Sequence, residues 1–337
     1  MASGNSWVDT HAHLPSSPAR FDLRPLSTGE LLDRTFQLYR SRFALFAGLA
    51  VLPAAVGVVM QAVRLLYSAH QSVQVHTGVN LVRVQVITVS LVFFYWLVTL
   101  VLYGITQAAT TWAVSAVYLG EPATIKAAYQ IALKHWFRYT LIVLRQIYGA
   151  FWLPIVLVAA GFVVGVAKRG TANGTVMAGA LFFAGFVSLA YAIWAYIRLL
   201  LAVPAAVVES TGVNASIRRS KHLLATRKVR IFLLLVFLFA LYFVIGAIQM
   251  PLAVIAVRTR GAEAFVTHAI TLAIQFLAGT VVGPIGAIAL CLFYIDERVR
   301  REGFDIEWMM SRIAPAAVVP NETPEELPPP QEGSAGV

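Results

Sequence analysis

Three side chains near the N-terminus have the types and the spacing of a metal site. Asp9, His11 and His13 lie in the segment WVDTHAHL, where the two histidines are separated by a single residue. Imidazole and carboxylate groups are the ligands that Zn²⁺ and related ions prefer, and metal-dependent hydrolases use them to activate water. A hydrolase is therefore the first activity that the sequence has to support or exclude.

The segment Asp9-Thr10-His11-Ala12-His13 resembles the opening motif of amidohydrolase and TatD-type hydrolases. That resemblance implies a catalytic metal at the end of the first strand of a barrel, with further ligands spread over about 250 residues. Here the segment follows MASGNS, which is no strand pattern, and precedes the loop-forming Pro-Ser-Ser-Pro. We therefore interpret the match as coincidental and expect no catalytic site, no metal and no cofactor. Residues 1–22 are predicted to be a disordered cytoplasmic tail.

Composition places the chain in the membrane. Of its 337 residues 59% are hydrophobic and only 12% are charged, whereas a soluble domain carries about 25% charged residues. The net charge of +10 could indicate nucleic-acid binding, but the basic residues flank long apolar runs. We expect anionic membrane lipids, and no nucleic acid, as the partners of these charges.

Six apolar stretches are long enough to cross a bilayer, which requires about 20 residues each. The predicted spans are residues 43–67, 84–118, 139–166, 176–208, 231–257 and 265–295. The second, fourth and sixth exceed the required length and are expected to tilt or to project from the membrane. The sequence predicts an all-α integral membrane protein with a six-helix transmembrane bundle in residues 23–312.

Lysine and arginine counts orient the bundle. The two terminal regions and the connections after the second and fourth spans hold eighteen of these residues, and the other three connections hold five. By the positive-inside rule both termini are cytoplasmic, as an even number of spans also requires. We expect a multi-pass protein of the bacterial inner membrane.

The cytoplasmic segments repeat with a nearly constant period. Four residues after the second span match four after the fourth at an offset of 92: Gly120, Ile125, Lys126 and Arg138 against Gly212, Ile217, Arg218 and Arg230. Such a period predicts three parallel repeats, approximately 26–118, 119–209 and 210–302. Each would contain a cytoplasmic amphipathic helix followed by two spans, the first of which carries an interior proline (Pro53, Pro154 or Pro251). The amphipathic helices would lie in the membrane interface, pack on their own bundle, or both.

Three runs, LRPLSTGELLDRTFQLYRSRF, AVPAAVVESTGVNASIRRSKHLLATRKVRIF and LFYIDERVRREGFDIEWM, resemble the membrane domain of bacterial glycerophosphoryl diester phosphodiesterases and its stand-alone relatives. The resemblance covers roughly residues 22–310. In fused members a soluble domain after the membrane domain performs the chemistry. No such domain follows here, so the resemblance implies a membrane module without that activity.

Arginines inside the spans are the leading candidates for a binding site. Arg145 and Arg198 lie about two turns from the predicted cytoplasmic ends of their spans, and no carboxylate accompanies them there. With Arg218, Arg219 and Lys221 they could form an anion or lipid-headgroup site. Glutamines could complete its polar centre: Gln107, Gln146, Gln249 and Gln275. The alternatives are structural arginines that extend to the interface, or a small transporter or permease whose substrate binds near Arg145 and Arg198.

The segment that follows the sixth span is rich in charge. Asp296, Arg298, Arg300 and Arg301 could dock a membrane or cytosolic protein partner, or they could form intrahelical pairs where a helix leaves the membrane. Residues 313–337, rich in proline and glutamate, are predicted to be a disordered tail. The leading functional hypothesis is a non-enzymatic membrane module that binds lipid or a partner and supports envelope function.

Overall fold

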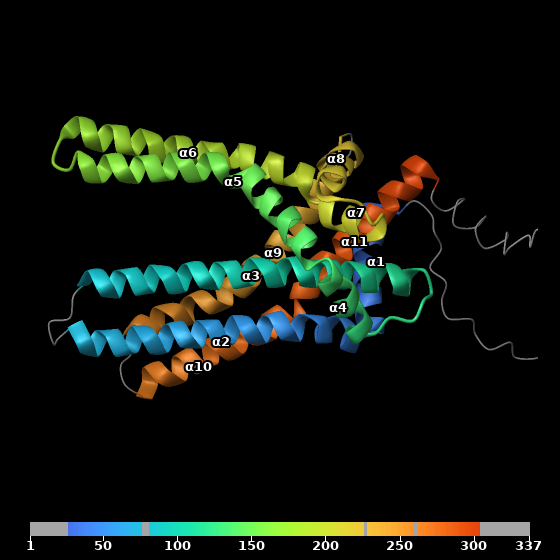
Figure 1. Ribbon diagram of the computed structural model, residues 1–337, viewed down its shortest axis with the longest axis horizontal. Helices are drawn as coiled ribbons and strands as arrows, with labels where there is room; N and C mark the ends of the chain where they lie inside the picture. The colour runs from blue at the N-terminus through green and yellow to red at the C-terminus, as the bar shows by residue number, and fades with distance from the viewer. Residues whose placement is uncertain (1–25, 76–80, 226–227, 259–261, 304–337) are drawn as a thin grey trace, which may run out of the picture.

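The computed structural model describes residues 26–75, 81–225, 228–258 and 262–303, and all regular structure within these ranges is helical (Figure 1). The Asp9, His11 and His13 segment and the two predicted tails lie outside the described residues. Six helical segments are long and apolar enough to cross a membrane: Phe43–Tyr67, Arg83–Tyr118, Trp136–Ala167, Ala172–Val208, Val229–Leu252 and Glu263–Glu302. The chain is thus a multi-pass membrane protein, and each segment overlaps a predicted span.

A short helix precedes two long segments, three times along the chain. The short helices are α1 (Thr28–Ser41), α4 (Ile125–Lys134) and α8 (Val213–Leu223). The long helices are α2 (Phe43–Val75), α3 (Leu81–Tyr118), α5 (Trp136–Ala167), α6 (Ala172–Leu199), α9 (Lys228–Arg258) and α10 (Ala262–Val281). Two further helices, α7 (Ala202–Val208) and α11 (Gly283–Glu302), continue the fourth and sixth segments.

The fourth and sixth spans, which were expected only to be longer than the membrane requires, are each broken into two helices. In the fourth span α6 ends at Leu199 and α7 starts at Ala202, close to Pro204. In the sixth, α10 ends at Val281 and α11 starts at Gly283, followed directly by Pro284. Proline lacks an amide hydrogen and clashes with the preceding turn, so a new helix begins where its φ angle is already suitable.

Side chains of two other helices form hydrogen bonds with backbone groups at the break in the fourth span. The Gln146 amide donates to the Leu199 carbonyl at 2.7 Å. The Ser220 hydroxyl donates to the Arg198 carbonyl at 2.9 Å and accepts from the Leu201 amide at 3.1 Å. Backbone groups without hydrogen-bond partners cost free energy in a membrane. The side chains of α5 and α8 supply these partners and so stabilise the break.

Helix α1 begins with a capping box, in which Ser27 and Glu30 each accept from the other's backbone amide. It buries Leu31, Leu38 and Tyr39 against the protein. In α4, Ala128 and Ala132 are buried, while Ile125 and, at the start of α5, Trp136 stay exposed. The short helices therefore contribute differently to packing.

The long helices form two groups that meet at one end of the molecule. Helices α2, α3, α9 and α10 run side by side, while α5 and α6 form a hairpin that diverges from α3 (Figure 1). The hairpin exposes large apolar side chains along its length, among them Phe162, Val176, Phe183 and Phe186. In a membrane these side chains would contact lipid. The short helices α1, α4, α7 and α8 all lie at the end where the two groups meet.

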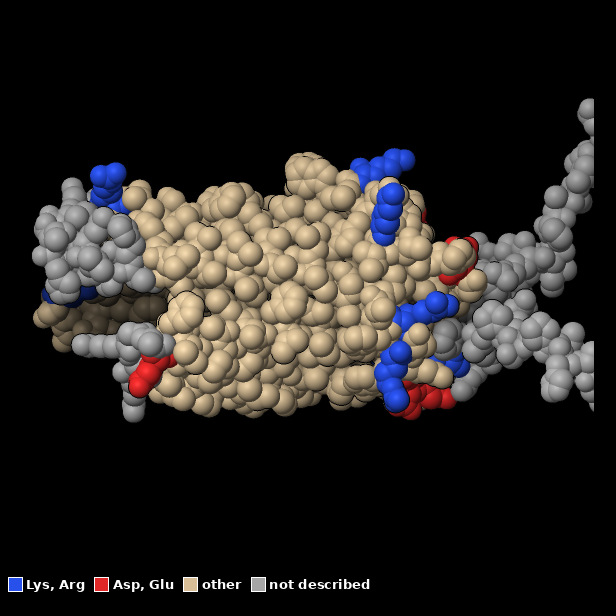
Figure 2. Space-filling model, turned by 90° about the horizontal axis from the view of Figure 1, so that it is seen from below, with Lys and Arg blue, Asp and Glu red and all other residues tan. Residues whose placement is uncertain are grey.

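Charged residues are unevenly distributed along the molecule. Figure 2 shows lysine and arginine gathered mainly at the end that holds the short helices, with a broad uncharged band across the middle of this face. That band is the appearance expected of a surface in contact with hydrocarbon.

Candidate functional site

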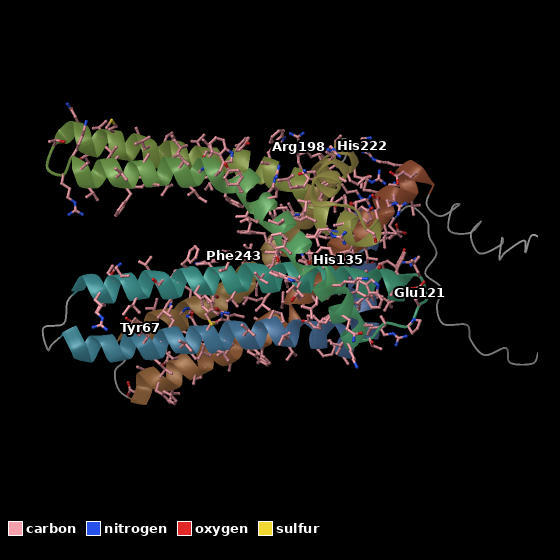
Figure 3. All side chains as sticks on the ribbon, viewed as in Figure 1. Tyr67, Glu121, His135, Arg198, His222 and Phe243 are labelled. Carbon is pink, nitrogen blue, oxygen red and sulfur yellow. The ribbon has the colours of Figure 1, made fainter. Side chains whose placement is uncertain are left out.

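The two predicted site arginines do not converge on one cavity. Arg145 is exposed on α5 and lines a shallow hollow together with Val213 and Asn214 of α8. Arg198 is half-buried on α6, and its guanidinium carbon lies 4.5 Å from the centre of the Trp194 ring. Figure 3 shows Arg198 on the side of the molecule near His222 and α8. Arg198 does not line the hollow that contains Arg145.

The three other candidates on α8 divide between surface and interior. Arg218 and Lys221 are exposed. Arg219 is paired with Glu302 at 2.5 Å and with Glu209 at 2.8 Å. The hydrogen bond that Arg219 donates to Glu302 is the main cause that raises the pKa of Arg219 above its ordinary value. Arg219 therefore connects α8 to the end of α7 and to α11 through its two ion pairs. Arg218 and Lys221 direct their charges to the surroundings.

A buried ion-pair cluster joins the N-terminal segment to α9 and α11. Arg230 of α9 donates to Asp296 and, at 2.5 Å, to the Leu26 carbonyl. The Leu26 amide donates to Asp296 at 2.7 Å. The side chains of Asp296 and Glu297 are 1% and 0% exposed, and Glu297 lies 3.4 Å from Arg230. A carboxylate is stable at such a depth only when opposite charge and hydrogen bonds compensate it.

A second cluster joins α7, α8 and α11. Glu209, at the end of α7, accepts from Arg219 and from the Tyr294 hydroxyl and lies 3.8 Å from Arg298. Glu302 accepts from Arg298 at 3.2 Å. Together the two clusters connect the three consecutive parts of the chain that each contain a short helix and two long segments.

The predicted docking residues all make contacts within the protein. Asp296 pairs with Arg300 at 3.0 Å, Glu297 with Arg301 at 3.6 Å and Arg298 with Glu302 at 3.2 Å, each four residues apart on α11. These are the intrahelical pairs of the alternative interpretation. Docking of a partner at these residues remains a prediction.

Sequence reasoning did not identify Arg230, Glu209 or Glu297 as site residues. Arg230 entered the sequence analysis as a basic residue of the connection after the fourth span and as a repeat position. Its partners Asp296 and Leu26 are 66 and 204 residues away in the chain. One signal was present, since the offset of 92 places Arg230 at the position equivalent to Arg138.

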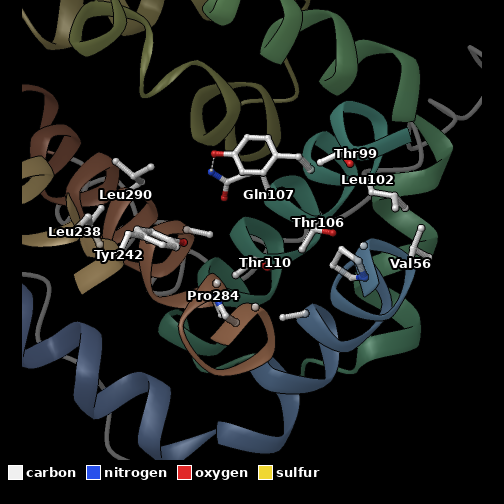
Figure 4. Close-up of a pocket in the computed structure, with 18 of the residues that line it drawn as sticks. Val56, Thr99, Leu102, Thr106, Gln107, Thr110, Leu238, Tyr242, Pro284 and Leu290 are labelled. Atoms are coloured by element: carbon white, nitrogen blue, oxygen red, sulfur yellow. Dashed lines mark hydrogen bonds between the residues drawn. The ribbon is translucent and has the colours of Figure 1, made fainter. Parts of the chain in front are cut away.

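A cavity of about 450 Å³ lies inside the bundle (Figure 4). Residues of α2, α3, α6, α9, α10 and α11 line it, and neither Arg145 nor Arg198 is among them. The lining is largely apolar, with Pro53 of α2 and Pro284 of α11 on its wall. No lysine, arginine, histidine, aspartate or glutamate is among the described residues that line this cavity.

Uncharged polar groups stand at several points around the cavity (Figure 4). The Gln107 amide donates to the Tyr103 hydroxyl at 3.1 Å, as the dashed line in Figure 4 marks. Tyr196 of α6 and Tyr242 of α9 also line the cavity. Thr110 adds a buried hydroxyl. Of the four predicted glutamines, Gln107 lines this cavity and Gln146 supports the broken span instead.

Tyr103 and Tyr196 are 93 residues apart in the sequence, close to the offset of 92 between the segments that follow the second and fourth spans. They lie on α3 and α6, and both line the cavity.

Among the parts of the chain that the structure describes, no group of three or more histidine, cysteine, aspartate or glutamate residues is placed to hold a metal ion. Comparison of the chain with family models, with curated proteins and with solved structures finds no match.

Proposed function

We propose that this protein is a non-catalytic membrane module that binds anionic lipid at its cytoplasmic end and supports envelope function. The observation that carries the proposal is a difference between acidic and basic side chains at that end: most carboxylates are bonded within the protein, whereas many basic side chains are exposed. Five of the seven carboxylates described there accept hydrogen bonds from the protein itself: Glu30, Glu209, Asp296, Glu297 and Glu302. Six basic side chains at this end are exposed, so their charges face the surroundings of the protein: Arg40, Arg42, Lys126, Lys134, Arg218 and Lys221.

Such a surface attracts anionic headgroups. Each basic side chain near a negatively charged leaflet contributes about 1 kcal/mol. The end of α4 and the start of α5 add an apolar contribution, because Leu133 and Trp136 are exposed on either side of Lys134. This combination is typical of a helix that lies in the membrane interface. Arg145, exposed about two turns deeper, would reach the phosphate of the same lipid layer.

The proposal includes the finer topology. We place both termini in the cytoplasm of a bacterial inner membrane, with the short helices on the cytoplasmic side. We further propose that the three units are repeats, which the shared period and the Tyr103 and Tyr196 pair support. The breaks after α1 and α4 support this too, since Arg42 and His135 have φ and ψ within 10° of each other (φ −130° and −129°, ψ 38° and 29°). Membership of the phosphodiesterase-associated membrane family is part of the same proposal.

Native mass spectrometry of the purified protein tests lipid binding. The variant Arg218→Gln/Lys221→Gln should retain several-fold less phosphatidylglycerol than the unmodified protein. Its matched control is Lys168→Gln/Arg169→Gln, which removes two exposed charges from the opposite end and should change nothing. Equal retention of phosphatidylglycerol and phosphatidylcholine by the unmodified protein would contradict the proposal.

A small permease with a substrate site near Arg145 and Arg198 is the alternative. It requires a continuous polar cavity that includes both arginines, whereas the described cavity is lined by neither. Its test is transport by an Arg198→Ala variant reconstituted in vesicles. Loss of a measured flux, with the fold intact, would favour the permease over the lipid-binding module.

A further inference from the structure

We propose that the cavity of about 450 Å³ binds an uncharged lipid whose head is a hydroxyl group. The proposal is independent of the anionic-lipid site, because the two use different residues at different depths. It rests on three features of the cavity: its place in the hydrocarbon layer, the chemistry of its lining and the side on which it opens.

The cavity lies well inside the membrane-spanning part of the bundle. Gly57 lies fourteen residues from the start of α2, which corresponds to about 21 Å along the helix. On α3, Thr110 is eight residues from the end at Tyr118, or about 12 Å. A molecule that reaches this depth comes most directly from the lipid phase. The volume lies within the range of about 300–1,000 Å³ that is common for ligand pockets.

The lining selects an uncharged head. Ionised groups are rare in the hydrocarbon layer unless an opposite charge pairs with them, and the described lining contains none. What it contains are donors and acceptors without charge: the hydroxyls of Tyr103 and Tyr242, the amide of Gln107 and the hydroxyl of Thr110. A hydroxyl can both donate to and accept from such groups. A phosphate or a carboxylate would find no cation there.

The open side of the cavity accounts for the apolar tail. Tyr103 and Tyr242 line the cavity and yet remain 45% and 50% exposed, and Phe239 beside them is 70% exposed. These residues belong to α3 and α9, within the membrane-spanning segments, so their exposed surface lies at the depth of the hydrocarbon layer. A head can therefore sit among the polar groups while a long tail stays in the lipid phase. Diacylglycerols and long-chain isoprenoid alcohols share this chemistry.

Two glycines allow a matched test of the site. A Cβ added at Gly57 meets nothing within 4 Å, and Gly57 lines the cavity, so Gly57→Phe should place its ring in that space. Gly246 of α9 also has nothing within 4 Å of an added side chain, but it does not line the cavity. Gly246→Phe is the control for the added bulk. Gln107→Leu removes the central polar group at similar volume.

The experiment measures binding of three probes to the full chain in detergent by native mass spectrometry: dioleoylglycerol, geranylgeraniol and dioleoylphosphatidate. We expect at least one of the two alcohols to bind at least tenfold more tightly than the phosphatidate. Gly57→Phe and Gln107→Leu should each weaken that binding at least tenfold, and Gly246→Phe should leave it unchanged. Preference for one alcohol identifies the source of the ligand.

Binding of neither alcohol would overturn the proposal, as would equal binding of the phosphatidate or an equal loss in Gly246→Phe. The Arg218→Gln/Lys221→Gln variant separates this result from the proposed function. It should bind the alcohol normally while it loses phosphatidylglycerol, so each site can fail independently of the other.

Discussion

At the scale of single residues, Arg230 makes several contacts at the end of the molecule that holds the short helices. Its side chain is only 12% exposed, and it donates to Asp296 and to the Leu26 carbonyl while its guanidinium lies 5.3 Å from the centre of the Phe293 ring. Glu297, without exposure, lies within 3.4 Å. Arg230 thus compensates two buried carboxylates and fixes the start of the described chain at once.

Replacement of Arg230 by methionine should therefore lower the free energy of unfolding by about 3–5 kcal/mol, since it leaves buried carboxylates with incomplete compensation. The measurement is denaturant unfolding in detergent micelles. Arg218→Met, at an exposed position on α8, should stay within about 0.5 kcal/mol of the unmodified protein. Similar losses in both variants would mean that the buried cluster has no special role.

The same residues show where sequence reasoning reaches its limit. The six spans could be predicted because length and apolar composition are local properties. The partners of Arg230 could not, because 66 and 204 residues separate them from it and no local pattern joins such distant groups. Pro204 and Pro284 were visible, but the apolar runs continue past both, so hydropathy alone did not reveal the breaks. The cavity depends on packing between units, which only the fold supplies.

At the scale of helices, the crossing of α3 over α5 joins the diverging hairpin to the rest of the bundle. Gly104 of α3 lies against the backbone of α5, where an added Cβ would stand 3.2 Å from the backbone of Thr140 and 3.3 Å from that of Tyr139. Backbone atoms cannot rotate away as the end of a flexible side chain can. The close approach therefore depends on the absence of a side chain at this position.

Gly104→Ala should destabilise the protein by about 1–3 kcal/mol, because α3 and α5 would have to separate. Its control is Gly179→Ala in α6, where an added Cβ meets nothing within 4 Å. The control should be neutral or slightly stabilising, since alanine favours a helix over glycine by about 0.5–1 kcal/mol. Thermal unfolding of both variants in the same detergent makes the comparison, and equal melting temperatures would contradict a tight crossing.

At the scale of the whole molecule, the first described residue, Leu26, is hydrogen-bonded to the last helix, α11. The Leu26 amide and carbonyl bind Asp296 and Arg230, and Ser27 caps α1 immediately afterwards. Deletion of residues 1–20 should leave the melting temperature unchanged. Deletion of residues 1–27 should lower it, because it removes both the contacts of Leu26 and a cap that contributes about 0.5–2 kcal/mol. Equal stability of the two truncated proteins would show that this closure contributes little.

The orientation of the whole molecule in the membrane can be tested, because its two ends differ in their content of basic residues. The end with the short helices holds most of the basic residues, and the sole cysteine, Cys291, is fully buried. New cysteines can therefore be labelled selectively at Ala225, which follows α8, and at Asn173, at the start of α6.

A membrane-impermeant maleimide should label Ala225→Cys in inside-out vesicles and Asn173→Cys in spheroplasts, because positively charged segments are retained on the cytoplasmic side. The opposite pattern would place the basic surface outside. It would also remove the anionic cytoplasmic leaflet as its partner, whereas the uncharged cavity could still take its ligand from either leaflet.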